Sequence, residues 1–120
     1  MSLLRIADSF YVGVRDVGAS ASWYIEKLGL KETDTKLDDG EGCITLTFPR
    51  ELPATIVIGP VTDAPDPATR MLYTGAIEKA HGWLNARGVP VGPIATDRQG
   101  TRYFSMQDLE GNPIEVSEEP

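Results

Sequence analysis

The segment YFSMQDLEGNPIEV, residues 103–116, carries the clearest structural pattern in the sequence. Its pattern is typical of two strands with alternating side chains, joined by a polar turn that carries Asp, Gly, Asn and Pro. Gly111 supplies the positive φ that such a turn commonly needs. On the second strand, Ile114 and Val116 point to one face of the sheet and Glu115 points to the other. The sequence therefore predicts a hairpin that presents a carboxylate on the face opposite to the core.

The rest of the chain predicts two units with the same order of elements. The first unit has a strand at residues 10–14, a helix between Asp16 and Gly29, a weak strand at 30–37, a turn at 38–41, and strands at 43–48 and 54–58. The second unit has a strand at 69–74, a helix that includes residues 77–84 and is closed by Gly88, a short strand at 91–96 and the final hairpin. These units predict one domain, 1–120, with module 1 at about residues 7–59, a proline-rich linker at 60–68 and module 2 at about 69–118.

The two halves align with a constant shift of sixty residues and no gap. Trp23 falls on Trp83, and Lys27 falls on Arg87. The shared order of strand, helix and hairpin favours an internal duplication.

Composition narrows the classes of function. The chain has 120 residues and a net charge of −7, which argues against nucleic acid and against an anionic membrane as partner. Cys43 is the single cysteine, so an intrachain disulfide is excluded and a reducing compartment is favoured. No apolar run resembles a signal sequence or a membrane span, and we expect a cytoplasmic protein.

Three segments of the first unit and the closing hairpin carry a resemblance to a known family. FYVGVRD (residues 10–16), SWY (22–24) and LGL (28–30) resemble the first module of the vicinal oxygen chelate superfamily, which includes glyoxalase I, bleomycin-resistance proteins and extradiol dioxygenases. DLEGNPIE (108–115) is similar to the characteristic final hairpin of that superfamily. The resemblance implies an α+β fold in which two βαβββ modules form a concave mixed β-sheet with helices on the outer face. It also implies a homodimer, with clefts formed within one chain or by exchanged modules.

In the metal-dependent members of this superfamily, each module presents a His on its first strand and a Glu on its last. Carried over by motif spacing, these positions are Ser9, Thr55, Thr69 and Glu115. Only the carboxylate is a good ligand for a divalent metal, since neutral hydroxyls are poor substitutes for imidazole or carboxylate. We therefore expect no metal ligands and no cofactor. His81 falls on the second helix, where we expect a surface or core-edge residue.

Side-chain alternation predicts which residues line the cleft of the sheet. The predicted ligand-binding residues are Ser9, Tyr11, Thr55, Val57, Thr69, Met71, Tyr73, Tyr103, Ser105 and Glu115. Cys43, Thr45 and Thr47 are expected to line the same concavity. Tyrosine combines flat apolar area with a hydrogen-bonding tip and suits an aromatic ligand. The plain alternative is that these are ordinary sheet residues, with Asp16, Asp108 and Glu110 serving as caps and turn residues.

Three functions remain open at this point. The first is a small-molecule binding protein, similar to the bleomycin-resistance branch, that holds an aromatic or cationic compound without a metal. The second is a metal-dependent lyase, isomerase or dioxygenase, lactoylglutathione-lyase-like or dioxygenase-like, in which Glu115 is the catalytic base or a ligand. The third is a sensory or partner-binding module. The sequence leaves open whether any reaction is catalysed.

Overall fold

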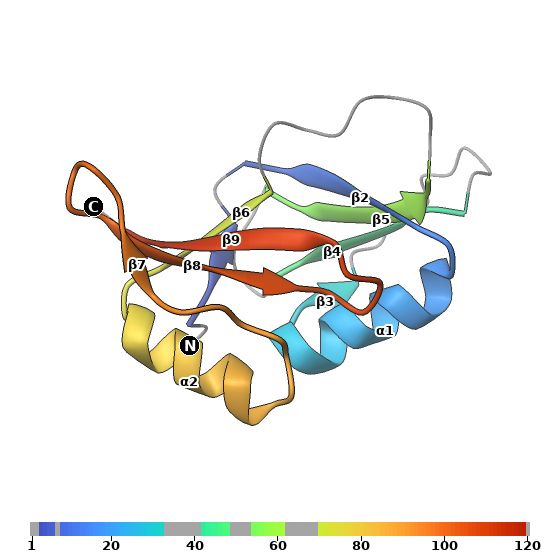
Figure 1. Cartoon of the computed structure of the whole chain (residues 1–120). Coiled ribbons are helices and arrows are strands. Elements are labelled where there is room, and N and C mark those ends of the chain that lie inside the picture. The colour runs from blue at the N-terminus through green and yellow to red at the C-terminus, as the bar shows by residue number, and fades with distance from the viewer. Residues whose placement is uncertain (1–2, 7, 33–41, 49–53, 62–69, 120) are drawn as a thin grey trace.

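The computed structural model describes residues 3–6, 8–32, 42–48, 54–61 and 70–119. Within these ranges the chain forms two helices and two mixed β-sheets, which confirms the predicted α+β class (Figure 1). Figure 1 shows both helices on the same side of the strands. No helix among the described residues is long and apolar enough to cross a membrane.

The first sheet comes entirely from the first half of the chain. Its strands, in spatial order, are β2 (Phe10–Val14), β5 (Ile56–Pro60), β4 (Ile44–Thr47) and β3 (Lys31–Glu32). β2 and β5 are parallel, and the other neighbours are antiparallel. Helix α1 (Val17–Leu28) packs against β4 and β5.

The second sheet repeats this arrangement and gains one strand. Its order is β1 (Arg5–Ile6), β6 (Met71–Thr74), β9 (Pro113–Glu118), β8 (Arg102–Gln107) and β7 (Ala95–Thr96). Helix α2 (Ile77–Ala86) packs against β8 and β9. The sequence did not predict β1, which comes from the start of the chain and pairs antiparallel with β6. Each half still follows the predicted βαβββ order, and the strands divide into two hydrogen-bonded sheets.

Local sequence rules place the ends of the helices and the final turn. The Asp16 side chain accepts a hydrogen bond from the backbone N–H of Ala19 at 3.0 Å, as expected of an N-cap. Gly29 ends α1 with φ of 80°, and Gly111 in the β8–β9 turn has φ of 85°. The predicted turn at 38–41 lies outside the described residues, as does most of the predicted linker.

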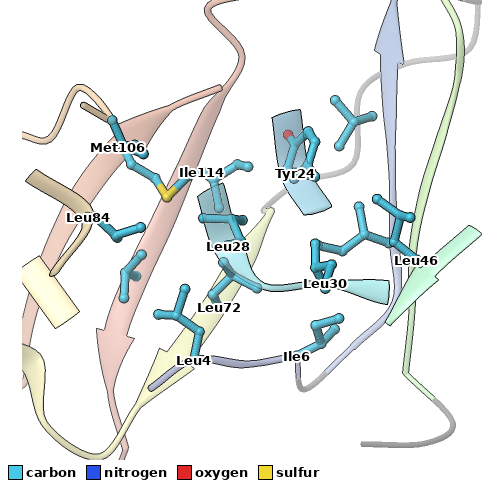
Figure 2. Close-up of a cluster of buried hydrophobic side chains, with 14 of the residues drawn as sticks. Leu4, Ile6, Tyr24, Leu28, Leu30, Leu46, Leu72, Leu84, Met106 and Ile114 are labelled. Carbon is cyan, nitrogen blue, oxygen red and sulfur yellow. The ribbon is translucent and has the colours of Figure 1, made fainter. Parts of the chain in front are cut away.

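One hydrophobic core spans both halves of the chain. Figure 2 shows Tyr24 and Leu28 of α1 close to Ile114 of β9 and Leu72 of β6. All four side chains are at most 1% exposed. Because the two halves share this core, the position of one sheet depends on the packing of the other.

The turn between β8 and β9 docks onto the first half of the chain. Asp108 is 4% exposed and accepts a hydrogen bond from the Tyr24 hydroxyl at 2.6 Å. The Glu110 carboxylate accepts hydrogen bonds from the backbone N–H groups of Arg15 at 2.8 Å and Asp16 at 2.9 Å, just before α1 begins. These two acidic residues therefore join the halves, beyond the turn role predicted for them.

The Glu110 contact makes stability depend on pH. The two backbone N–H donors, from Arg15 first and Asp16 second, hold the pKa of the Glu110 carboxyl below its ordinary value of 4.5. A carboxyl whose pKa is lower in the folded state stabilises the fold above its unfolded pKa, and this contribution is lost as pH falls below about 4.5. Between about pH 6 and about pH 3, the free energy of unfolding measured in urea should therefore fall less for Glu110→Gln than for the wild type. Glu32→Gln on β3 is the control, and equal slopes in all three proteins would contradict the assignment.

Hydrogen bonds also join the C-terminal ends of the two helices. Arg87 donates from Nε to the Lys27 carbonyl at 3.0 Å and from Nη2 to the Glu26 carbonyl at 2.5 Å. Lys27 donates from Nζ to the Arg87 carbonyl at 2.9 Å. Basic groups are favoured where a helix leaves its last carbonyls unpaired. Lys27 and Arg87 are sixty residues apart, so this reciprocal contact supports the predicted repeat.

Replacing Arg87 with alanine should lower the free energy of unfolding by about 1 kcal/mol, because the last carbonyls of α1 lose their charged donor and helix ends are stabilised by such groups. The guanidinium also lies 4.6 Å from the ring centre of Trp83, and this contact is lost too. Lys79→Ala, an exposed change on the same helix, is the control. Urea unfolding measures both, and equal small effects would show that the reciprocal contact contributes nothing.

Candidate functional site

The face of the second sheet that points away from α2 carries the predicted carboxylate. The strand register places Met71 of β6 and Ser105 of β8 on either side of Glu115 of β9. Glu115 is half-buried, whereas its chain neighbours Ile114 and Val116 are fully buried on the opposite face. The alternation predicted for the final strand is therefore confirmed.

The next row of the same face is aromatic. Tyr73 of β6 and Tyr103 of β8 flank Ser117 of β9. Both tyrosines are half-buried, and Ser117 is 8% exposed. Sequence analysis missed Ser117, although its place two residues after Glu115 puts it on the same face. We call the side chains of Met71, Tyr73, Tyr103, Ser105, Glu115 and Ser117 the helix-free face.

Four polar groups on the helix-free face have no protein partner in the described parts of the chain. Neither the Glu115 carboxylate nor the Ser105 hydroxyl makes a hydrogen bond or ion pair there. The same holds for the hydroxyls of Tyr73 and Tyr103, and neither ring contacts another aromatic ring. Groups that the fold leaves unpaired beside apolar surface are available to a ligand.

The corresponding face of the first sheet differs, because polar side chains there form hydrogen bonds with other groups of the protein. Tyr11 lies in a row with Val57 and Thr45, and its hydroxyl donates to the Pro60 carbonyl at 2.5 Å. Thr47 donates to the Ala54 carbonyl at 3.1 Å. Among the described residues, this face of the first sheet therefore offers fewer unpaired polar groups than the helix-free face.

Ser9 and Thr55, the two metal positions predicted in the first module, lie next to each other. The Ser9 hydroxyl accepts a hydrogen bond from the Thr55 backbone N–H at 2.8 Å, and the two hydroxyl oxygens are 3.5 Å apart. Their contact fixes the chain where β2 meets β5. Thr69, the third predicted position, lies outside the described residues.

The gapless sixty-residue alignment is wrong for the last strand of the first module. Glu115 occupies the middle of the row that also contains Met71 and Ser105, and the matching row in the first sheet has Val57 in the middle. The reason is loop length. Paired residues that flank the first hairpin are ten apart (Leu46 and Ile56), and the equivalent residues in the second are eight apart (Met106 and Ile114). The counterpart of Glu115 is therefore Val57 and not Thr55.

The described residues at the predicted metal positions do not fit a divalent metal site. In the described ranges, no group of three or more His, Cys, Asp or Glu side chains lies close enough to hold an ion. At the positions compared, Ser9 and Thr55 carry hydroxyls, Val57 carries an isopropyl group, and Glu115 carries the one carboxylate. A divalent ion needs several convergent imidazole, carboxylate or thiolate groups, so these positions supply too few donors.

His81 has a structural role at the edge of the core. Its Nε2 lies 2.8 Å from the Gly92 carbonyl oxygen, which can only accept, so Nε2 carries the proton. The ring packs edge-on against Phe104 at 4.8 Å. This contact joins α2 to the segment before β7, away from the helix-free face.

The family follows from a comparison with family models. Residues 5–116 match the model of the Glyoxalase/Bleomycin resistance protein/Dioxygenase superfamily. The chain belongs to this superfamily. No curated protein matches the chain at a significant level of similarity.

Solved structures share the fold over nearly the whole chain. A member of the same superfamily from Sphaerobacter thermophilus is 25% identical, with a TM-score of 0.78, and the match covers 94% of this chain and 96% of that one. TnmS3, an antibiotic binding protein from Streptomyces sp. CB03234, is 19% identical, with a TM-score of 0.77 and 95% of each chain covered. A lactoylglutathione lyase from Agrobacterium tumefaciens is 16% identical, with a TM-score of 0.66 and coverage of 93% and 92%. The last two likenesses concern the fold alone.

Proposed function

We propose that this protein binds a small organic molecule, aromatic or cationic, on its helix-free face and does so without a divalent metal. The observation that carries the proposal is the half-buried Glu115 carboxylate, which has no protein partner in the described ranges and stands beside Met71 and Ser105. A carboxylate is costly to desolvate alone, so a ligand that supplies a donor or a cation gains from contact with it.

Three further properties support binding in preference to metal-assisted catalysis. Tyrosine faces and a methionine side chain give apolar contact area, while the hydroxyls and one carboxylate can fix the orientation of a bound ligand through hydrogen bonds. Of the predicted metal positions among the described residues, only Glu115 offers a good ligand for the metal ion that polarises a substrate oxygen in a metal-dependent enzyme. The net charge of −7 favours approach of a cation.

The homodimer and the cytoplasmic location remain predictions.

Isothermal titration of the protein, after chelation of metals, against a panel of aromatic and glycopeptide antibiotics and simple aromatic cations tests the proposal. We expect at least one compound to bind with one site per chain, and the affinity to be unchanged by added nickel, zinc, manganese or iron. Absence of binding across the panel contradicts the proposal. Binding that requires about one equivalent of metal would restore the alternative, a metal-dependent enzyme with Glu115 as base or ligand.

The Glu115→Gln variant should bind a cationic panel ligand about tenfold more weakly, because the charge-assisted contact becomes a neutral one. A neutral ligand of similar shape should lose much less. Glu32→Gln removes an equal charge from an exposed strand and controls for the change in net charge. Wild-type affinity for cations in Glu115→Gln would remove this carboxylate from the site.

A further inference from the structure

We infer that the preferred ligand is an aryl-alkylamine: a flat aromatic group that lies on Tyr73 and Tyr103, joined by a short spacer to a protonated amine at Glu115. This inference rests on the proposed function and specifies its ligand class. It follows from the register of the three central strands of the second sheet, which sets the order and spacing of the groups.

The aromatic end of the site is the row that contains Tyr73, Ser117 and Tyr103. The two tyrosines stand on strands that are separated by β9, so their backbones are about 10 Å apart. The residue between them is a small serine, 8% exposed, whose side chain is too short to keep the rings apart. Neither tyrosine contacts another aromatic ring in the described ranges. A flat ligand ring therefore finds two aromatic surfaces on one side of it, in the offset or edge-on arrangements that aromatic groups prefer.

The end of the site that would bind the ligand's cation is Glu115. It lies two residues before Ser117 on the same strand and the same face. Two residues along a strand span about 7 Å, which sets the distance from the aromatic row to the carboxylate. Met71 lies beside Glu115 in the same row and adds a polarisable side chain next to the carboxylate. In the described ranges no Lys or Arg side chain pairs with Glu115, so a ligand amine would supply the missing positive charge.

A basic side chain of the protein lies at the β1 edge of the aromatic row. Arg5 of β1 pairs in register with Tyr73, on the side of that tyrosine away from β9. Its Nε is 3.0 Å from the Glu119 carboxylate, which compensates its charge. The face therefore has a compensated ion pair at one edge of the aromatic row and, two residues earlier along β9, a carboxylate with no partner in the described ranges. This polarity orients the amine toward Glu115 and disfavours a ligand that carries a carboxylate there.

In the part of the chain that the structure describes, the first sheet lacks the same combination on its corresponding face. Val57 stands in the place of Glu115, and the Tyr11 hydroxyl is already bound to the Pro60 carbonyl. The combination of two tyrosines and a carboxylate is found on the second sheet.

Titration calorimetry with a series of 2-naphthyl-alkylamines, from one to five methylene groups in the spacer, tests this inference. We expect the affinity to pass through a maximum at an intermediate length, where the amine reaches about 7 Å from the ring. The alcohol of the best length should bind about tenfold more weakly and the carboxylic acid more weakly still. In Glu115→Gln, amine and alcohol should bind equally.

The tyrosines are tested with paired variants. Tyr73→Leu and Tyr103→Leu should each weaken the best amine about fivefold, while Tyr73→Phe and Tyr103→Phe should retain affinity within about twofold, because the ring and not the hydroxyl makes the contact. Thermal unfolding of each variant shows that the fold is kept. If amine, alcohol and acid bind alike, or if the leucine variants bind like the wild type, the inference is overturned. If a panel antibiotic binds while no naphthyl-alkylamine does, the inference fails and the proposed function stands. If nothing binds, both fail.

Discussion

Replacing Asp108 with alanine should lower the free energy of unfolding by about 3 kcal/mol, because one buried hydroxyl and two part-buried backbone N–H groups lose their acceptor at once. Asp108 accepts from the Tyr24 hydroxyl and from the backbone N–H groups of Glu110 and Asn112. Burial, followed by the charge of Asp108, raises the pKa of the Tyr24 hydroxyl above its ordinary value of 10.0, so this group stays a donor across the ordinary pH range. Without the carboxylate, the hydroxyl is left buried and unpaired. Urea unfolding at neutral pH measures the loss.

A matched control exists in the same chain. Asp97 accepts from the backbone N–H groups of Gln99 and Thr101 in an exposed loop, and makes no bond to the other half in the described residues. Asp97→Ala should cost about 1 kcal/mol or less, because water replaces the lost acceptor. Tyr24→Phe should cost about 1 kcal/mol, and the double variant with Asp108→Ala should cost less than the sum of the two. A loss of less than 1 kcal/mol for Asp108→Ala would show that the turn does not join the two halves.

Gly59→Ala should lower the free energy of unfolding by about 2 kcal/mol, although the backbone there suits alanine. A Cβ at this position would lie 2.5 Å from the Tyr11 hydroxyl oxygen, 2.7 Å from the Cys43 Sγ and 3.0 Å from Cε2 of the Tyr11 ring. The Tyr11 hydroxyl is held by the Pro60 carbonyl, so the ring moves only if that bond breaks. In the absence of a clash, alanine in place of glycine would be stabilising by about 0.5 kcal/mol or more, because the unfolded chain loses conformational freedom.

The comparison for this change is Gly92→Ala. There the nearest atom to a new Cβ is the Ser105 carbonyl oxygen at 3.7 Å, an ordinary contact. We expect it to leave the midpoint of urea unfolding unchanged or slightly higher. Adding Cys43→Ala to Gly59→Ala should recover part of the loss, since one of the two clashing groups is removed. Equal behaviour of the two glycine variants would mean that Tyr11 does not lie over Gly59 in solution.

Local chemistry explains why much of the fold was predictable from the sequence. Asp16 and Gly29 follow capping rules that depend only on neighbouring residues, and the structure confirms the helix ends predicted from them. The alternation of Ile114, Glu115 and Val116 likewise depends only on the period of a strand. These rules located the carboxylate of the candidate site on its face without knowledge of the partner strands.

Features that depend on distant segments were not predictable in this way. Strand β1 forms because two residues at the start of the chain, Arg5 and Ile6, meet β6 more than sixty residues later. The docking of Glu110 onto Arg15 depends on how the two halves pack. Ser117 was overlooked because its importance comes from the tyrosines on the neighbouring strands and not from its own sequence context.

The unequal hairpins show what kind of length change this scaffold tolerates. The first hairpin is longer than the second by two residues, and an even number keeps every later side chain of β5 on its original face. An odd number would have turned Ile56 and Ile58 out of the interior, where both are now fully buried. The longer loop therefore leaves the packed layer of the first sheet intact. Val57 and Glu115 hold the same place in their two sheets, so the modules differ there by a substitution on the strand.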